Sequence, residues 1–212
     1  MGLLRGGEKM DKWTKIPDEK IIEETIKALA PRGISAEVVE NGKEAKEKVM
    51  SLLPNGSRVL TSTSTTLEEI GIHDEIEETD KIVSVRKEYM GLNHENDAEK
   101  IRVLRSTPEI VIGSVHAVTK KGEVIIASNT GSQIAPYAYS AKKVIWVVGA
   151  QKIVNDLNEG NERLQNYVVP LEEKHMQSLY GVGTNVSKLL IFNKEIAKDR
   201  VTLIFVKEKL GF

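Results

Sequence analysis

The feature that most constrains the fold is a run of five apolar residues, Val144 to Val148. A strand that is apolar at every position has both faces buried, which is typical of a central strand in a parallel sheet covered by helices. The run is far shorter than the ~20 residues that a helix needs to cross a bilayer. It therefore predicts a helix-covered parallel sheet, with no membrane span.

Helical and extended patterns alternate around this run, which indicates parallel strands joined by crossover helices. We expect strands at residues 34–40, 58–61, 109–112, 122–127, 144–148, 189–192 and 201–206. We expect helices at residues 18–29, 41–53, from 67 onward, 96–105, 133–139, 155–167 and 171–179. The predicted fold class is α/β, a mainly parallel sheet flanked by helices.

Composition excludes several classes of function. The 212 residues carry 30 Lys and Arg against 31 Asp and Glu, a net charge of −1, and contain no Cys. Near-neutral charge provides no field that would attract nucleic acid or an anionic membrane. Without Cys this chain has no disulfide, thiolate zinc site or iron–sulfur cluster of its own. We expect a cytoplasmic protein that carries no cofactor.

Domain organisation is predicted to be simple, because a chain of this length can bury one sizeable core. Residues 1–15 are expected to be a flexible N-terminus, since the segment Met1 to Lys9 has no periodicity and is too short and polar for a secretory signal. Residues 16–212 show no linker and no internal repeat, so a single domain is expected there.

A first candidate binding loop consists of five consecutive hydroxyl residues between a predicted strand and a predicted helix. In open α/β sheets ligands bind at the carboxyl ends of strands, and hydroxyls with free backbone N–H groups suit a carboxylate or phosphate. The alternative is that Ser64 or Thr65 only caps the helix, but a cap needs one hydroxyl. The candidate ligand-binding residues are Ser62, Thr63, Ser64, Thr65 and Thr66.

A second candidate loop follows the strand at 122–127. Gly131 permits a positive φ, so that backbone N–H groups could point toward a ligand. The alternative is an ordinary polar turn, in which the same residue types are common. The candidate residues are Asn129, Thr130, Gly131, Ser132 and Gln133.

A third loop follows the run 144–148 and contains Gln151 and Lys152, of which Lys152 could neutralise an anion; a solvated lysine is the alternative. His116 and Glu123 are the candidate catalytic residues, His116 as an acid or base and Glu123 as a nucleophile. No pair among the four His has the spacing of a metalloenzyme, so no metal site is expected.

Four blocks of sequence, in their order and spacing, resemble the lactate-utilisation (LUD) domain family, which includes lactate utilization protein C. The resemblance spans roughly Ile34 to Pro170, and the blocks are VLTSTSTTLEEIG, EIVIGSVHAVTKKGE, SNTGS and VIWVVGAQKIV. It implies a fold similar to the ribose-5-phosphate isomerase, glucosamine-6-phosphate deaminase and CoA-transferase superfamily, whose members bind small anions at sheet-end loops. In that comparison residues 62–66 match the phosphate loop, and residues 149–152 match a loop typical of the family.

The resemblance also implies partners, because other family members work beside iron–sulfur subunits that oxidise L-lactate to pyruvate. Sugar-phosphate isomerases of the superfamily carry carboxylates in the loop that corresponds to residues 113–119, where a base must act. This chain has none there, which argues against isomerase activity. A CoA-transferase would need a nucleophilic glutamate, for which Glu123 is the nearest candidate.

Three hypotheses follow. The first is an accessory subunit that binds a small carboxylate or phosphate ligand and works in the oxidation of L-lactate or a related 2-hydroxy acid. The second is a free-standing enzyme on a sugar phosphate, CoA ester or folate-like substrate, using His116, Glu123 or Lys152. The third is a ligand-free homodimer, in which the polar loops are plain helix caps.

Overall fold

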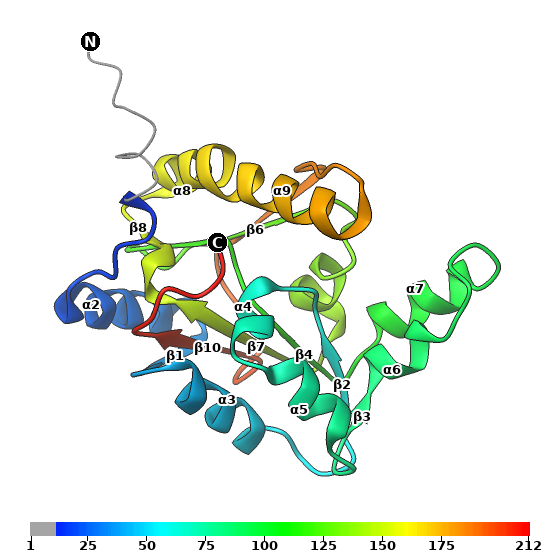
Figure 1. Ribbon diagram of the computed structural model, residues 1–212. Helices are drawn as coiled ribbons and strands as arrows, with labels where there is room; N and C mark the ends of the chain where they lie inside the picture. The colour runs from blue at the N-terminus through cyan, green and yellow to red at the C-terminus, as the bar shows by residue number, and fades with distance from the viewer. Residues whose placement is uncertain (1–11) are drawn as a thin grey trace.

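A computed structural model describes residues 12–212 and is built around a six-stranded, fully parallel sheet (Figure 1). Its strand order is β1-β10-β7-β4-β2-β3. The strand bounds are β1 Ile34–Val39, β2 Arg58–Thr61, β3 Val83–Ser84, β4 Ile110–Gly113, β7 Lys143–Gly149 and β10 Val201–Val206. The predicted α/β class with a parallel, helix-flanked sheet is therefore confirmed.

Strand β7 has the central place that its sequence predicts, since it pairs with β10 on one side and β4 on the other. Its side chains alternate between two cores. Val144, Trp146 and Val148 belong to the core on one face, whereas Ile145 and Val147 belong to the core on the other. All five are buried, which explains why no polar residue interrupts the run.

A second, four-stranded sheet was not predicted. It has the order β8-β5-β6-β9, and β6 is antiparallel to both β5 and β9. The bounds are β5 Ala117–Thr119, β6 Val124–Ser128, β8 Ile153–Val154 and β9 Lys188–Phe192. We expected the segments 122–127 and 189–192 to be strands of the same, mainly parallel sheet as the run 144–148. That expectation was wrong about the sheet, because an apolar pattern shows that a strand is buried but not which strand it pairs with.

The main sheet lies between two layers (Figure 1). Helices α3 to α5 cover one face, and the second sheet packs on the other face together with α2, α6 and α7. Helices α3 to α5 pack against the main sheet through residues such as Val49, Leu67 and Ile76, and the segment from α8 to α9 covers the second sheet through Leu164 and Val168. The helical bounds are α2 Glu19–Leu29, η1 Ala30–Arg32, α3 Gly42–Ser51, α4 Thr65–Glu69, α5 Ile72–Glu78, α6 Val85–Met90, α7 Ala98–Ser106, η2 Pro136–Ser140, η3 Ala150–Lys152, α8 Leu157–Arg163, η4 Leu164–Val168 and α9 Val169–Tyr180.

Packing begins earlier in the chain than the predicted domain boundary at residue 16. Trp13 is 5% exposed and lies in the core between the second sheet and α8, and Lys12 pairs with Glu159 at 2.8 Å. The rest of the predicted flexible N-terminus, residues 1–11, lies outside the described residues. None of the helices within residues 12–212 combines the length and the apolar character that crossing a bilayer requires.

Candidate functional site

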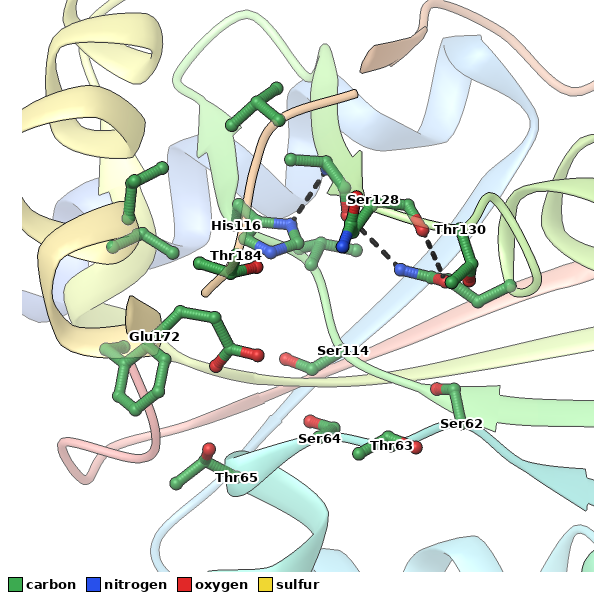
Figure 2. A pocket seen from close by; sticks show the side chains of 18 of the residues that line it. Ser62, Thr63, Ser64, Thr65, Ser114, His116, Ser128, Thr130, Glu172 and Thr184 are labelled. Atoms are coloured by element: carbon green, nitrogen blue, oxygen red, sulfur yellow. Dashed lines mark hydrogen bonds between the residues drawn. The ribbon is translucent and has the colours of Figure 1, made fainter. Parts of the chain in front are cut away.

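A pocket of about 360 Å³ lies between the two sheets, at the carboxyl ends of three neighbouring strands of the main sheet (Figure 2). The residues that follow β2, β4 and β7 line it, and α9 forms the facing wall. Parallel strands that are neighbours end at the same edge of a sheet, and this brings segments distant in the sequence together. The lining includes these candidate residues from the three predicted loops: Ser62, Thr63, Ser64, Thr65, Thr66, Asn129, Thr130, Ser132, Gln133 and Lys152.

Lys152 joins two of the strand ends at the pocket wall. The residue is 2% exposed, and its Nζ donates to Thr66 Oγ1 at 2.9 Å and to Ser114 Oγ at 3.2 Å. Among residues 12–212 no Asp or Glu forms an ion pair with it. Lys152 is therefore buried at this strand end and not solvated, as the alternative in the sequence analysis would have it.

A second buried cation lies behind the pocket. Arg163 is 0% exposed, and its Nη1 donates to the His116 carbonyl oxygen at 2.6 Å, while Nε and Nη2 have no partner among the described residues. Burial lowers the pKa of Lys152 well below its usual value, and the charge of Arg163 lowers it further; Glu69 acts in the opposite direction. A buried guanidinium without an acidic partner among the described residues favours an anionic ligand in this region.

The hydroxyl groups of the loop 62–66 differ in whether they are hydrogen-bonded within the protein. Ser62 is committed to the protein, because its Oγ contacts the Tyr137 hydroxyl at 2.8 Å and the Ile112 carbonyl oxygen at 3.1 Å. The hydroxyls of Thr63, Ser64 and Thr65 form no hydrogen bond within residues 12–212. Ser64 is the N-cap of α4 by position, yet its side chain does not cap the helix. The capping alternative therefore does not explain these three hydroxyls.

The loop after β6 is different, since its polar groups are bonded to one another. Ser128 Oγ accepts from the Gly131 N–H at 2.8 Å and donates to Gln133 Oε1 at 2.9 Å, and Ser132 N–H bonds to Thr130 Oγ1. Asn129 Oδ1 accepts from Ser187, which lies just before β9. The expectation that the N–H groups of this loop point toward a ligand was wrong for those of Gly131 and Ser132.

Gly131 does not line the pocket, but its φ of 85° is the left-handed conformation that the sequence predicted. A Cβ atom there would lie 2.7 Å from Lys188 Cδ. The glycine is therefore required by the turn and by the neighbouring strand, not by a ligand.

His116 lines the pocket with its ring, and its hydrogen bond fixes the tautomer. Nδ1 accepts from the Ala127 N–H at 3.0 Å, so the proton of the neutral ring is on Nε2. Burial lowers the pKa of His116 to about 3, helped by the charges of Lys152 and Arg163. At neutral pH this side chain can donate a hydrogen bond through Nε2–H, and its role as an acid or base stays a prediction.

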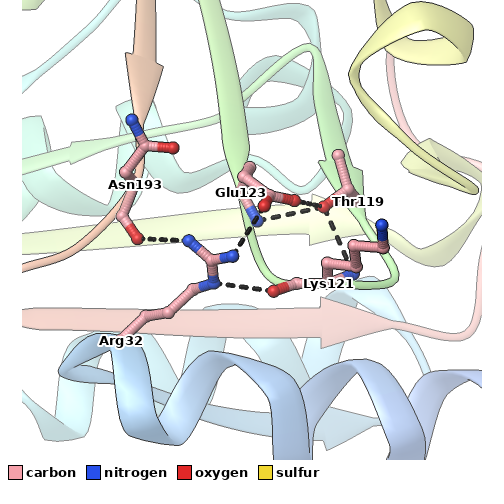
Figure 3. Close-up of polar contacts among 5 residues, drawn as sticks. All are labelled: Arg32, Thr119, Lys121, Glu123 and Asn193. Atoms are coloured by element: carbon pink, nitrogen blue, oxygen red, sulfur yellow. Dashed lines mark hydrogen bonds and ion pairs between the residues drawn. The ribbon is translucent and has the colours of Figure 1, made fainter.

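Gln151 and Glu123 are not at the pocket. Gln151 is 3% exposed, and its Nε2 donates to the Leu210 carbonyl oxygen at 2.8 Å, which fastens the segment after β10. Glu123 pairs with Arg32 at 2.6 Å and also accepts from Thr119 (Figure 3). Neither residue has its predicted role. Gln151 anchors the segment after β10, and Glu123 stabilises the turn between β5 and β6. Because the Glu123 carboxylate is bonded to Arg32 and Thr119, it is not suited to act as a nucleophile.

Two pocket residues were missed by the sequence analysis. Glu172 of α9 points its carboxyl group into the pocket toward Ser114 (Figure 2), and burial raises its pKa. Arg105 of α7 lines the opposite side, where its Nη2 donates to Ser132 Oγ at 2.8 Å and its buried Nε has no partner among residues 12–212.

The amino-acid sequence matches the model of a known protein family. The model of the LUD domain matches residues 22–206. The chain belongs to the LUD-domain family. This confirms the resemblance stated above and extends it over nearly the whole described chain.

Solved structures similar to this LUD domain include a DUF162 family protein from Deinococcus radiodurans, with 13% identity and a TM-score of 0.54 over 91% of this chain and 99% of that one. Weaker likenesses are to eIF2B beta from Chaetomium thermophilum (16% identity, TM-score 0.37, 56% and 44% of the two chains) and to the translation initiation factor eIF-2B of Pyrococcus horikoshii OT3 (17%, 0.32, 66% and 52%). The similarity to the DUF162 family protein shows a shared fold and nothing about function. The similarities to the two eIF2B proteins are too weak to support a conclusion. No curated protein matches the chain significantly.

The LUD domain has no group of three or more His, Asp and Glu residues within 12–212 that could hold a metal ion. The sequence does contain a signal for Glu172. It lies on one helical stripe with Val168, Val169, Met176 and Tyr180, all of which line the pocket. A single acid within an otherwise apolar stripe of a helix marks a site where a carboxyl group faces the interior.

Proposed function

We propose that this LUD domain binds a small carboxylate, a 2-hydroxy acid such as L-lactate or the corresponding 2-oxo acid, in the pocket between the sheets. The observation that carries the proposal is that Lys152 and Arg105 line the same pocket without a carboxylate partner within residues 12–212. An anion would supply the counter-charge of Arg105 and could accept a hydrogen bond from the Lys152 amine. The free hydroxyls of Thr63, Ser64 and Thr65 add uncharged donors beside them.

The proposed role is that of an accessory subunit in 2-hydroxy-acid oxidation. Removing two electrons from a hydroxy acid requires an acceptor, and a chain without Cys cannot carry an iron–sulfur cluster on thiolates. The redox groups would then belong to separate iron–sulfur subunits. We expect the purified chain to bind the acid but not to oxidise it when it is alone.

The test is thermal unfolding of the purified chain with L-lactate, pyruvate, glycolate, ribose 5-phosphate and CoA. A ligand at 100 times its dissociation constant should stabilise the fold by about 2.7 kcal/mol. We expect stabilisation by the hydroxy and oxo acids only. The substitution Arg105→Gln should reduce it, whereas Arg58→Gln, at an arginine paired with Glu88 outside the pocket, should not. No shift with any of the small acids would overturn the proposal.

A second candidate function, a free-standing enzyme, is favoured by one observation. Glu172 and Lys152 line the same pocket, and burial shifts the pKa of each toward its uncharged form. A pair of titratable groups with pKa values shifted in this way is typical of sites that transfer protons. Stabilisation by ribose 5-phosphate or CoA, together with turnover by the chain alone, would support this candidate over the first.

A further inference from the structure

Lys152 has surroundings that a lysine used only as a positive charge does not need. Among residues 12–212 it is the only buried lysine, and both contacts of its Nζ are to hydroxyl oxygens. Arg163, which is also buried and has no acidic partner in the described chain, acts on it as a nearby like charge. These surroundings favour the uncharged amine, which is a nucleophile.

We propose that the Lys152 amine adds to the keto carbon of a 2-oxo acid in the pocket and forms a reversible imine with it. This inference rests on the proposed function and names the substrate class more narrowly, as an acid whose carbonyl adjoins its carboxylate. The hydroxyls of Thr63, Ser64 and Thr65 precede Thr66, whose own hydroxyl contacts Nζ. A carboxylate held by those three groups would place the next carbon beside the amine.

The step balances without an oxidant or a reductant. Nζ forms a bond to the keto carbon, the electron pair of the carbonyl bond moves to oxygen, and one proton passes from nitrogen to that oxygen. The resulting carbinolamine takes up a second proton on its oxygen and loses water, while the nitrogen lone pair forms the carbon–nitrogen double bond. The products are one water molecule and a protonated imine.

Glu172 is placed to supply the second proton. Its carboxyl group points toward Ser114, whose hydroxyl contacts Lys152 Nζ (Figure 2). Burial raises the pKa of the Glu172 carboxyl, which favours the proton-carrying form that a donor needs. His116 stands beside this pair as a donor through Nε2–H and can hydrogen-bond the oxygen of the bound acid.

The test is reductive trapping, in which pyruvate is the probe and sodium borohydride reduces any imine to a stable secondary amine. Intact-protein mass spectrometry measures the adduct, and peptide mapping locates it. We expect one carboxyethyl group on Lys152 in the wild-type chain and in Lys188→Arg, a matched control at an exposed lysine outside the pocket. Lys152→Arg should carry none.

A second variant tests the proton donor. Glu172→Gln should slow the rate of trapping by roughly 10²-fold, the usual contribution of a general acid. Glu162→Gln, at an exposed position of α8, should keep the wild-type rate. An unchanged rate in Glu172→Gln would overturn the role of this carboxyl group.

The thermal-shift and trapping experiments distinguish a failure of the imine proposal from a failure of the proposed function. A wild-type chain that pyruvate or L-lactate stabilises against heat, but that acquires no adduct at Lys152, overturns the imine and leaves the proposed function standing. Absence of both results overturns both proposals. An adduct mapped to another lysine also overturns the inference, and this mapping needs no variant to fold.

Discussion

The two loops of the pocket are both rich in polar residues, but they differ in whether their polar groups are hydrogen-bonded within the protein. Residues 62–66 leave three hydroxyls without a partner in the described chain, beside a buried lysine. In residues 128–133 the N–H groups and side chains bond to one another and to β9. The difference teaches that a run of small polar residues becomes a binding loop only where the fold leaves its donors unsatisfied. Three experiments test this contrast, and a fourth tests the neutral state of His116 in the same pocket.

The largest effect is expected for Lys152→Met. Removing the buried amine should abolish the stabilisation by pyruvate or L-lactate, a loss of about 2.7 kcal/mol at a ligand concentration of 100 times the dissociation constant. The same change in β9 beside the other loop, Lys188→Met, should keep the response. Thermal unfolding with and without ligand measures both. If both variants respond like the wild type, the two loops do not differ as we describe.

Gly131→Ala should cost stability but not binding. The backbone there has a φ of 85°, and the new Cβ atom would lie 2.7 Å from Lys188 Cδ. The strain of such a conformation for a residue with a side chain is about 1–2 kcal/mol, to be measured by urea unfolding. Gly56→Ala is the matched control, because its φ is 79° and nothing lies within 4 Å. A smaller loss at Gly131 than at Gly56 would contradict the contact with Lys188.

The pH dependence of stability tests the neutral state of His116. Its pKa is about 3 in the folded chain against an ordinary 6.5, so below pH 6.5 the unfolded chain binds a proton that the folded one does not. His116 alone should lower the free energy of unfolding by about 1.4 kcal/mol for each pH unit as pH decreases from 6 toward 4. His116→Gln should reduce this slope in urea unfolding. His73 also has a lowered pKa, about 4, so His73→Gln should reduce the pH dependence of stability by a further amount. An unchanged slope in His116→Gln would show that the ring is protonated when folded.

The smallest effect is expected for Thr65→Val. Its hydroxyl has no partner in the described chain, so its loss should leave stability unchanged and weaken ligand binding by about 0.5–1.5 kcal/mol. Thr130→Val on the other loop should leave affinity at the wild-type value, because that hydroxyl bonds to Ser132. Isothermal titration with pyruvate would compare the two. Equal losses of affinity would erase the distinction between the loops.

Local patterns in the sequence were sufficient for most of the main sheet. The run 144–148 predicted a central strand because alternate side chains of β7 enter two different cores. Asn41 was predicted to begin a helix, and its side chain does accept a hydrogen bond from the Glu44 N–H. These features depend on neighbours in the sequence, which is why they could be predicted.

The sequence by itself determined the fold class, the family and the hydroxyl-rich and lysine-bearing loops. Only the tertiary structure decided the second sheet, the place of Glu172 and Arg105 at the pocket, and the different states of the two loops. The physical reason is that pairing between strands and the satisfaction of a donor depend on groups far apart in the chain. Lys152 and Thr66 lie in separate segments, and their contact at 2.9 Å exists only because β7, β4 and β2 are adjacent and parallel.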